Sequence, residues 1–63
     1  MFNLDTRNAI KRAGLFGYEV AAALGISETS FSRKIARSEL PQDEKDRILH
    51  AVEKLIVERT ASA

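Results

Sequence analysis

The sequence predicts an all-α domain of four helices packed around one small core. Apolar side chains recur three or four positions apart along most of the chain, and no stretch alternates apolar and polar residues as a strand does. The 63 residues contain no internal repeat, low-complexity tract or long linker, so we expect one domain over residues 1–63. At this length only about 60% of the unfolded chain's surface can be buried, so the core must be small.

The first helix is delimited by residues that favour helix ends. Asn3 or Asp5 can cap its start, and the helix is expected to run to about Ala13. Gly14 follows at the position where helices commonly end in a left-handed residue. These signals predict one short helix followed by a turn.

The next two helices are short and separated by a brief turn. The second is expected over residues 17–24 and ends at Gly25. Ser27 then supplies the side-chain oxygen that caps a third helix over residues 28–37. Apolar residues on one face of each helix should point to the core, namely Val20 and Leu24, then Phe31 and Ile35.

A longer fourth helix is expected over residues 41–59. Pro41 suits its first position, because proline has no N–H to leave unpaired there. Acidic side chains follow in the first turns, where the helix dipole favours negative charge: Asp43, Glu44 and Asp46. An apolar stripe comes next, formed by Ile48, Leu49, Val52, Leu55 and Ile56. Residues 61–63 are expected to fray.

Residues 17–37 have the spacing of a helix-turn-helix, in which two helices cross at a steep angle over a short turn. Ala21 is small enough to let the helices approach, Gly25 tolerates the positive φ that the turn needs, and Ile26 is expected to plug the turn. Phe31 and Ile35 are the apolar residues that the second helix turns toward the first. The full set of offsets is more specific than a helix–glycine–helix hairpin alone.

On these residues the chain resembles the Xre/Cro type of helix-turn-helix regulators, which have the lambda-repressor-like fold. The matching residues are Val20-Ala21, Leu24-Gly25-Ile26-Ser27 and Thr29-Ser30-Phe31-Ser32-Arg33. The similarity covers about residues 4–58 and is strongest to short members from phages and mobile elements. Gly17 stands where many members carry a glutamine that contacts the DNA backbone, and Lys34 stands where an aliphatic residue is usual.

The resemblance implies that helix 28–37 docks in the major groove of double-stranded DNA. The residues expected to contact DNA are Ser27, Glu28, Thr29, Ser30, Ser32, Arg33, Lys34 and Arg37. Arginine can read guanine O6 and N7, and serine or threonine can contact base edges or phosphates. Lys34 and Arg37 suit the phosphate backbone. Glu28 either accepts from a cytosine N4 or only stabilises the helix N-terminus.

The charge distribution agrees with an anionic partner, although the net charge is only +1. Residues 1–40 carry six basic and four acidic side chains, whereas residues 41–63 carry four basic and five acidic ones. The stretch from Ser30 to Ser38 holds three positive charges and no negative one. The cations of the first helix, Arg7, Lys11 and Arg12, either add backbone contacts or form a solvated face.

Several classes of function have no residues in their favour. The chain has no cysteine, and His50 is its only histidine, so we expect no metal, no cofactor and no catalytic triad. Residues 1–3 do not open a signal peptide, and no apolar run approaches a membrane span. We therefore expect a cytoplasmic protein that is not an enzyme.

The expected function is sequence-specific transcriptional regulation, more often repression than activation. One alternative is an accessory DNA-binding factor for excision or recombination in a mobile element. Another is a protein-interaction module such as an antitoxin. The fourth helix carries more apolar surface than one short core requires, so a homodimer through its C-terminal half is also expected, using Leu49, Ile56 and Val57.

Overall fold

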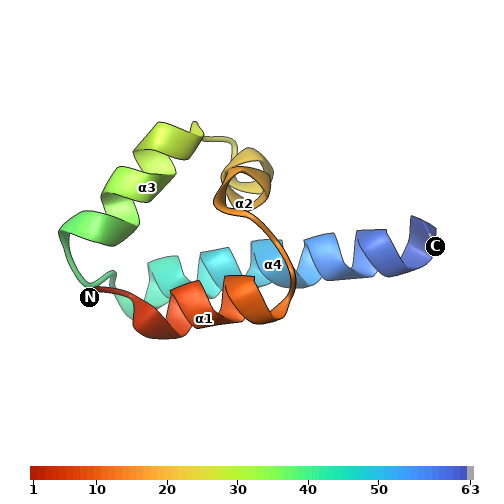
Figure 1. Cartoon of the computed structure of the whole chain (residues 1–63), viewed down its shortest axis with the longest axis horizontal. Coiled ribbons are helices and arrows are strands. Elements are labelled where there is room, and N and C mark those ends of the chain that lie inside the picture. Colours follow the sequence, from red (N-terminus) through yellow and green to blue (C-terminus); the bar gives the residue numbers. More distant parts are fainter. Residues whose placement is uncertain (63) are drawn as a thin grey trace.

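The computed structural model describes residues 1–62, and within this range all regular structure is helical. The four helices are α1 (Leu4–Arg12), α2 (Gly17–Leu24), α3 (Glu28–Arg37) and α4 (Gln42–Ser62). α1 and α4 lie side by side and run in the same direction, whereas α2 crosses above α4 and is seen nearly end-on (Figure 1). The predicted all-α class is confirmed.

The core lies where the helices meet, and all four contribute buried side chains to it, α1 through Ile10. Val20, Ala21 and Phe31 are at most 1% exposed, and Ile35, Ile48 and Val52 are also buried. Leu24 and Leu55 pack against this cluster while remaining partly accessible. The inward faces predicted for α2 and α3 are therefore confirmed.

α1 and α2 end in the same way, each with a left-handed glycine. Gly14 has φ 71° and Gly25 has φ 76°. After α2, the Gly25 N–H donates to Ala22 and the Ile26 N–H donates to Ala21, which is the double bond pattern of a Schellman motif. Both predicted helix ends are confirmed.

The residue after each glycine has a different environment. Leu15 is buried, but Ile26, which was expected to plug the turn after α2, is 37% exposed. The side chain of Ile26 borders an open hollow beside Leu24 and Phe31, which leaves more than a third of it accessible to solvent. The expectation that Ile26 is an enclosed plug is wrong.

The ends of α4 differ slightly from the prediction. The Pro41 carbonyl accepts from the Glu44 and Lys45 N–H groups, so Pro41 precedes the helix as its cap residue and does not open it. At the other end the helix continues to Ser62, beyond the predicted end near residue 59. Arg59 anchors this extension by donating to the Gly14 carbonyl and to Glu19. Ala63 lies outside the described residues.

The start of α1 departs most from expectation. Asn3 occupies the cap position, but its side chain makes no bond to α1 and is fully buried instead. Asp5 supplies the local bond, since its Oδ1 accepts from the Thr6 N–H at 2.9 Å. Asn3 is therefore free to bond elsewhere in the fold.

Candidate nucleic-acid interface

The face of α3 opposite the core consists of polar and basic side chains. Because Phe31 and Ile35 point inward, residues about half a turn away must face solvent. All the residues predicted on this outer face and its flank are exposed, namely Thr29, Ser30, Ser32, Arg33 and Arg37. The fold thus presents them together on one rigid helix.

The N-terminus of α3 is fixed by two serines. The Ser27 Oγ accepts from the Ser30 N–H at 3.1 Å and donates to the Ser30 Oγ at 2.9 Å. This confirms Ser27 as the helix cap and leaves the Ser30 hydroxyl hydrogen available to another acceptor. Glu28 follows in the first turn and is exposed. This position is compatible both with contact to a cytosine and with a role limited to stabilising the helix N-terminus.

The three cations of α3 differ in their pairing. Lys34 forms an ion pair with Glu44 of α4, with 2.7 Å between Nζ and Oε1. The side chains of Arg33 and Arg37 have no hydrogen bond or ion pair to any of the residues 1–62. The unpaired positive charge of α3 therefore belongs to the two arginines, whose guanidinium groups are free to donate.

An open hollow of about 490 Å³ lies where α3 meets the start of α4. It is lined by Ser30, Arg33, Lys34, Arg37, Ser38, Leu40, Pro41 and Glu44. Polar and cationic groups of α3 therefore share one concave surface with the N-terminal turn of α4. Such a surface can follow a rounded polyanion more closely than one convex helix can.

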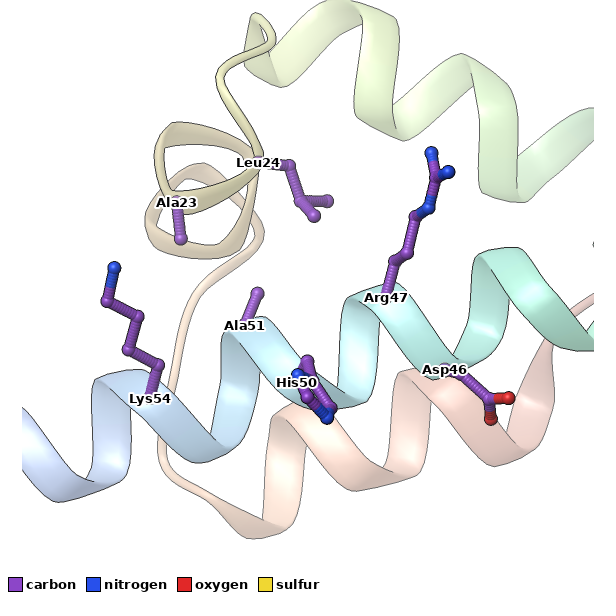
Figure 2. Close-up of a pocket in the computed structure, with 7 residues that line it drawn as sticks. All are labelled: Ala23, Leu24, Asp46, Arg47, His50, Ala51 and Lys54. Carbon is purple, nitrogen blue, oxygen red and sulfur yellow. The ribbon is translucent and has the colours of Figure 1, made fainter.

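Arg47 of α4 is a further cation near α3, outside the set of residues that the sequence predicts at the interface. It has no partner within residues 1–62 and extends from α4 toward α3 (Figure 2). Together with Lys54 and His50 it borders a second open hollow, of about 540 Å³, whose apolar residues are Ala23, Leu24 and Ala51. Its position next to α3 depends on the packing of α4, which residue spacing does not reveal.

The cations of α1 are placed apart from the outer face of α3. Arg7 is held within the fold, since its Nε donates to the Phe2 carbonyl at 3.0 Å and its Nη2 to the Ile35 carbonyl at 3.5 Å. Lys11 and Arg12 are exposed at the far end of α1, which runs away from α3 (Figure 1). The solvated-face interpretation is therefore favoured for these two residues.

An exposed aromatic pair marks the start of α2. The rings of Phe16 and Tyr18 stack with centroids 5.7 Å apart and an angle of 8° between their planes. Both side chains are more than half exposed. Helical spacing does not predict this pair, because residues two positions apart do not share a helix face.

The acidic start of α4 has internal partners. Glu44 pairs with Lys34, and Asp46 accepts from the side-chain amide of Gln42 at 2.9 Å. Within residues 1–62 no three histidine, aspartate or glutamate side chains are grouped so that they can hold a metal ion. In the same part of the chain, no helix combines the length and apolar character needed to cross a membrane.

Comparison with known proteins finds no family model that matches this chain, and no curated protein or solved structure with significant similarity to it.

Proposed function

We propose that this protein is a sequence-specific, double-stranded DNA-binding transcriptional regulator of the lambda-repressor-like helix-turn-helix type. α2 and α3 form the motif, and α3 docks in the major groove. The observation that carries the proposal is the outer face of α3, where unpaired Arg33 and Arg37 lie beside Thr29 and Ser30. The opposite face of the same helix is anchored in the core by Phe31 and Ile35.

The dimensions and chemistry of B-DNA suit this arrangement. The major groove is about 12 Å wide and admits one helix of about 10–12 Å diameter. Arg33 lies in the middle of α3 and can donate two hydrogen bonds to guanine O6 and N7. Thr29 and Ser30 lie near the N-terminal end, which enters deepest in this type of docking.

The remaining residues of the interface have supporting roles. Ser27 and Ser32 flank the outer face and can contact phosphates, and Arg37 lies one turn beyond Arg33. Lys34 reaches phosphate when its pair with Glu44 opens, since its side chain is 48% exposed. Glu28 adds selectivity for cytosine if it faces a base, at the expense of affinity for phosphate.

The protein acts as a homodimer in this proposal. Leu49 and Ile56 are about 40% exposed and lie seven residues apart, so they share one side of α4. Val57 is 66% exposed and lies about 100° further around the helix. A two-fold dimer through these side chains reads two half-sites about 34 Å apart.

Repression is the simplest output, because a bound dimer blocks polymerase without any further domain. The same interface also permits an accessory role in excision or recombination, where the bound sites lie at the ends of an element. A protein-interaction module such as an antitoxin is the alternative outside DNA binding. It requires no affinity for a duplex.

Selection of bound duplexes from a random pool tests the proposal. Enrichment of a palindrome supports specific DNA binding by a dimer. The affinity for the enriched duplex should fall steeply as salt rises, because each neutralised phosphate releases counterions. If no sequence is enriched and affinity for duplex DNA is absent at low salt, the interaction module replaces the regulator as the best account.

Analytical ultracentrifugation tests the dimer separately. Wild type should sediment as a dimer at high concentration or on the enriched palindrome, and Ile56→Glu should sediment as a monomer. Leu4→Glu is the matched control, because Leu4 is also exposed but lies on α1. A monomeric wild type with and without DNA contradicts the dimer and leaves the α3 interface intact.

A further inference from the structure

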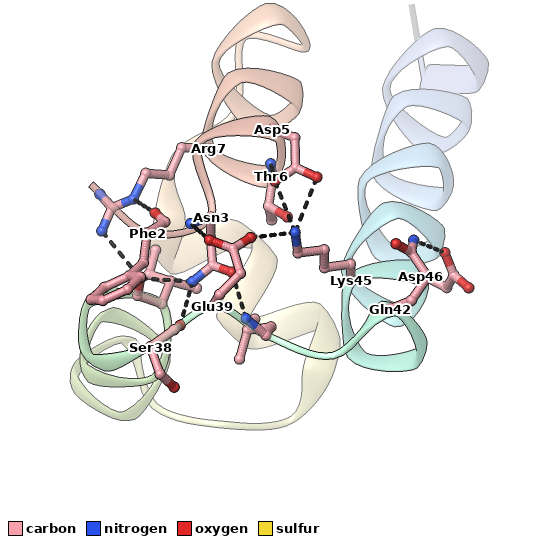
Figure 3. A network of polar contacts seen from close by, with 12 residues as sticks. Phe2, Asn3, Asp5, Thr6, Arg7, Ser38, Glu39, Gln42, Lys45 and Asp46 are labelled. Carbon is pink, nitrogen blue, oxygen red and sulfur yellow. Dashed lines mark hydrogen bonds and ion pairs between the residues drawn. The ribbon is translucent and has the colours of Figure 1, made fainter.

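The side chain of Asn3 is buried at the end of α3, where three hydrogen bonds hold it. Its Nδ2 donates to the Ile35 carbonyl at 2.8 Å and to the Ser38 carbonyl at 2.9 Å. Its Oδ1 accepts from the Leu40 N–H at 2.8 Å. All three of these bonds connect the amide to the segment that ends α3 and leads to α4 (Figure 3).

The end of α3 has no comparable support of its own. α1 and α2 end in left-handed glycines, but Ser38 after α3 is extended, with φ −161° and ψ 163°. The last carbonyls of a helix need partners from outside when the chain leaves in this way. Asn3 provides that partner to the Ile35 carbonyl, and Arg7 adds a longer contact of 3.5 Å to the same oxygen.

The backbone of Asn3 is fixed as well, by its conformation and by a hydrogen bond from its N–H. It has φ 57°, a left-handed conformation that asparagine tolerates better than most residues. Its N–H donates to the Glu39 Oε1 at 2.9 Å, and Lys45 of α4 pairs with both Glu39 and Asp5 (Figure 3). The N-terminus, the end of α3 and the start of α4 are thereby joined at one point.

We propose that Asn3 is a positioning residue for α3, which sets the angle of that helix without touching DNA. This inference rests on the proposed DNA-binding function, in which α3 must fit the major groove as a rigid unit. Arg33 and Arg37 lie in the last half of α3, within five residues of the Asn3 bonds. Loss of those bonds releases the half of the helix that carries the two arginines.

The expected change in DNA affinity follows from the fraction of molecules in which α3 is correctly oriented. Apparent affinity falls in proportion to the fraction of molecules in the competent state. If removal of the Asn3 side chain lowers that fraction to about one tenth, the dissociation constant for the enriched duplex rises about tenfold.

The test compares Asn3→Gly with a core variant of similar stability. Glycine accepts the positive φ at this position, so Asn3→Gly removes the side-chain bonds without straining the backbone. Val52→Ala is the control, because Val52 is 4% exposed on α4 and forms none of the Asn3 bonds. Asn3→Asp keeps the acceptor for the Leu40 N–H but loses the donor to Ile35 and Ser38.

Two measurements are made at a temperature where all variants are folded. Amide hydrogen exchange of the free protein should show faster exchange at Leu40 in Asn3→Gly than in Val52→Ala. Binding of the enriched duplex should weaken about tenfold in Asn3→Gly and Asn3→Asp, and by less than about twofold in Val52→Ala.

The outcomes separate this inference from the function on which it rests. Absence of duplex binding by wild type overturns the proposed function. Binding by wild type with equal affinities for Asn3→Gly and Val52→Ala overturns the positioning role alone. Unchanged exchange at Leu40 in Asn3→Gly overturns it as well, because the side chain then does not hold the end of α3.

Discussion

Lys34 of α3 and Glu44 of α4 form an ion pair of 2.7 Å across the hollow beside the outer face of α3. The pair joins the proposed recognition helix to the acidic start of α4. It also holds one of the three cations of α3 away from an external anion. Glu44 therefore neutralises one of the positive charges that α3 presents on this surface.

Glu44→Gln should strengthen binding to random-sequence duplexes and make it more sensitive to salt. The freed Lys34 can neutralise one more phosphate, which steepens the dependence of log affinity on log salt by about one unit. Glu53→Gln is the control, because it changes the net charge equally on an exposed part of α4. Titrations at several salt concentrations measure both slopes, and equal slopes in the two variants contradict the role of the pair.

Arg33→Ala should weaken binding of the enriched duplex by about 1–3 kcal/mol and relax its sequence preference. The physical reason is the loss of a bidentate contact to one guanine. Competition between the enriched and random duplexes measures the effect, with Lys54→Ala as a control that removes an exposed cation of α4. An equal loss on both duplexes assigns Arg33 to phosphate contact.

The acidic partners of Lys45 should make stability depend on pH. The pKa of Asp5 is lowered from 3.8 by the Thr6 N–H and then by Lys45, and the pKa of Glu39 is lowered from 4.5 by the Asn3 N–H and then by Lys45. A carboxyl with a lowered pKa stabilises the fold above its unfolded pKa, and this contribution is lost as pH falls through the folded value. The free energy of unfolding should therefore decline below pH 4.5 and fall further below 3.8.

Urea unfolding between about pH 2 and pH 7 measures this decline. The double variant Asp5→Asn/Glu39→Gln should show a flatter curve than Asp43→Asn/Glu53→Gln, which removes the same charge from exposed positions. Lys45 also makes the free energy of unfolding depend on pH in the alkaline range. Its pKa is raised above 10.5, chiefly by its bond with Glu39, so its contribution disappears as pH rises through the folded value. Parallel acid curves for the two double variants contradict the prediction.

Gly25→Ala should destabilise the protein through its backbone alone. A Cβ at this position meets no atom within 4 Å, but φ is 76°, and a left-handed conformation costs a residue with a side chain about 1–2 kcal/mol. Gly17→Ala is the matched control, since its φ is not positive and its Cβ lies 3.9 Å from the Phe31 ring, an ordinary contact. The Gly17→Ala variant should raise the free energy of unfolding by up to about 1 kcal/mol. If the midpoint of thermal unfolding shifts equally in both variants, the left-handed backbone at position 25 does not strain an alanine.

Local signals predicted most of the fold. Ser27, Gly14 and Gly25 act within a few residues of themselves, so capping and turn chemistry predicted the helix ends that they determine. The inward stripes of α2 and α3 followed from spacing, because a helix has a fixed period. The exposed face of α3 was predicted for the same reason.

Contacts between distant segments were not predictable in this way. Asparagine is a residue type that commonly caps helices, so the sequence predicts Asn3 or Asp5 as the cap of α1. The neighbouring residues in the sequence do not indicate that the Asn3 amide bonds to the end of α3 instead. The pairing of Lys34 with Glu44 and the approach of Arg47 to α3 depend on how α4 packs. Ile26 matched the spacing of a plug, but spacing does not state whether a neighbour covers the side chain.

The bonds of Asn3 also bear on the order of folding. They join residues 32, 35 and 37 positions apart in the sequence, so a long loop must close before any of them forms. The main packing partner of α3 among the earlier helices is α2, which is adjacent in the chain. We therefore expect the N-terminal segment to dock after α2 and α3 have packed, so that its bonds slow unfolding more than they speed folding.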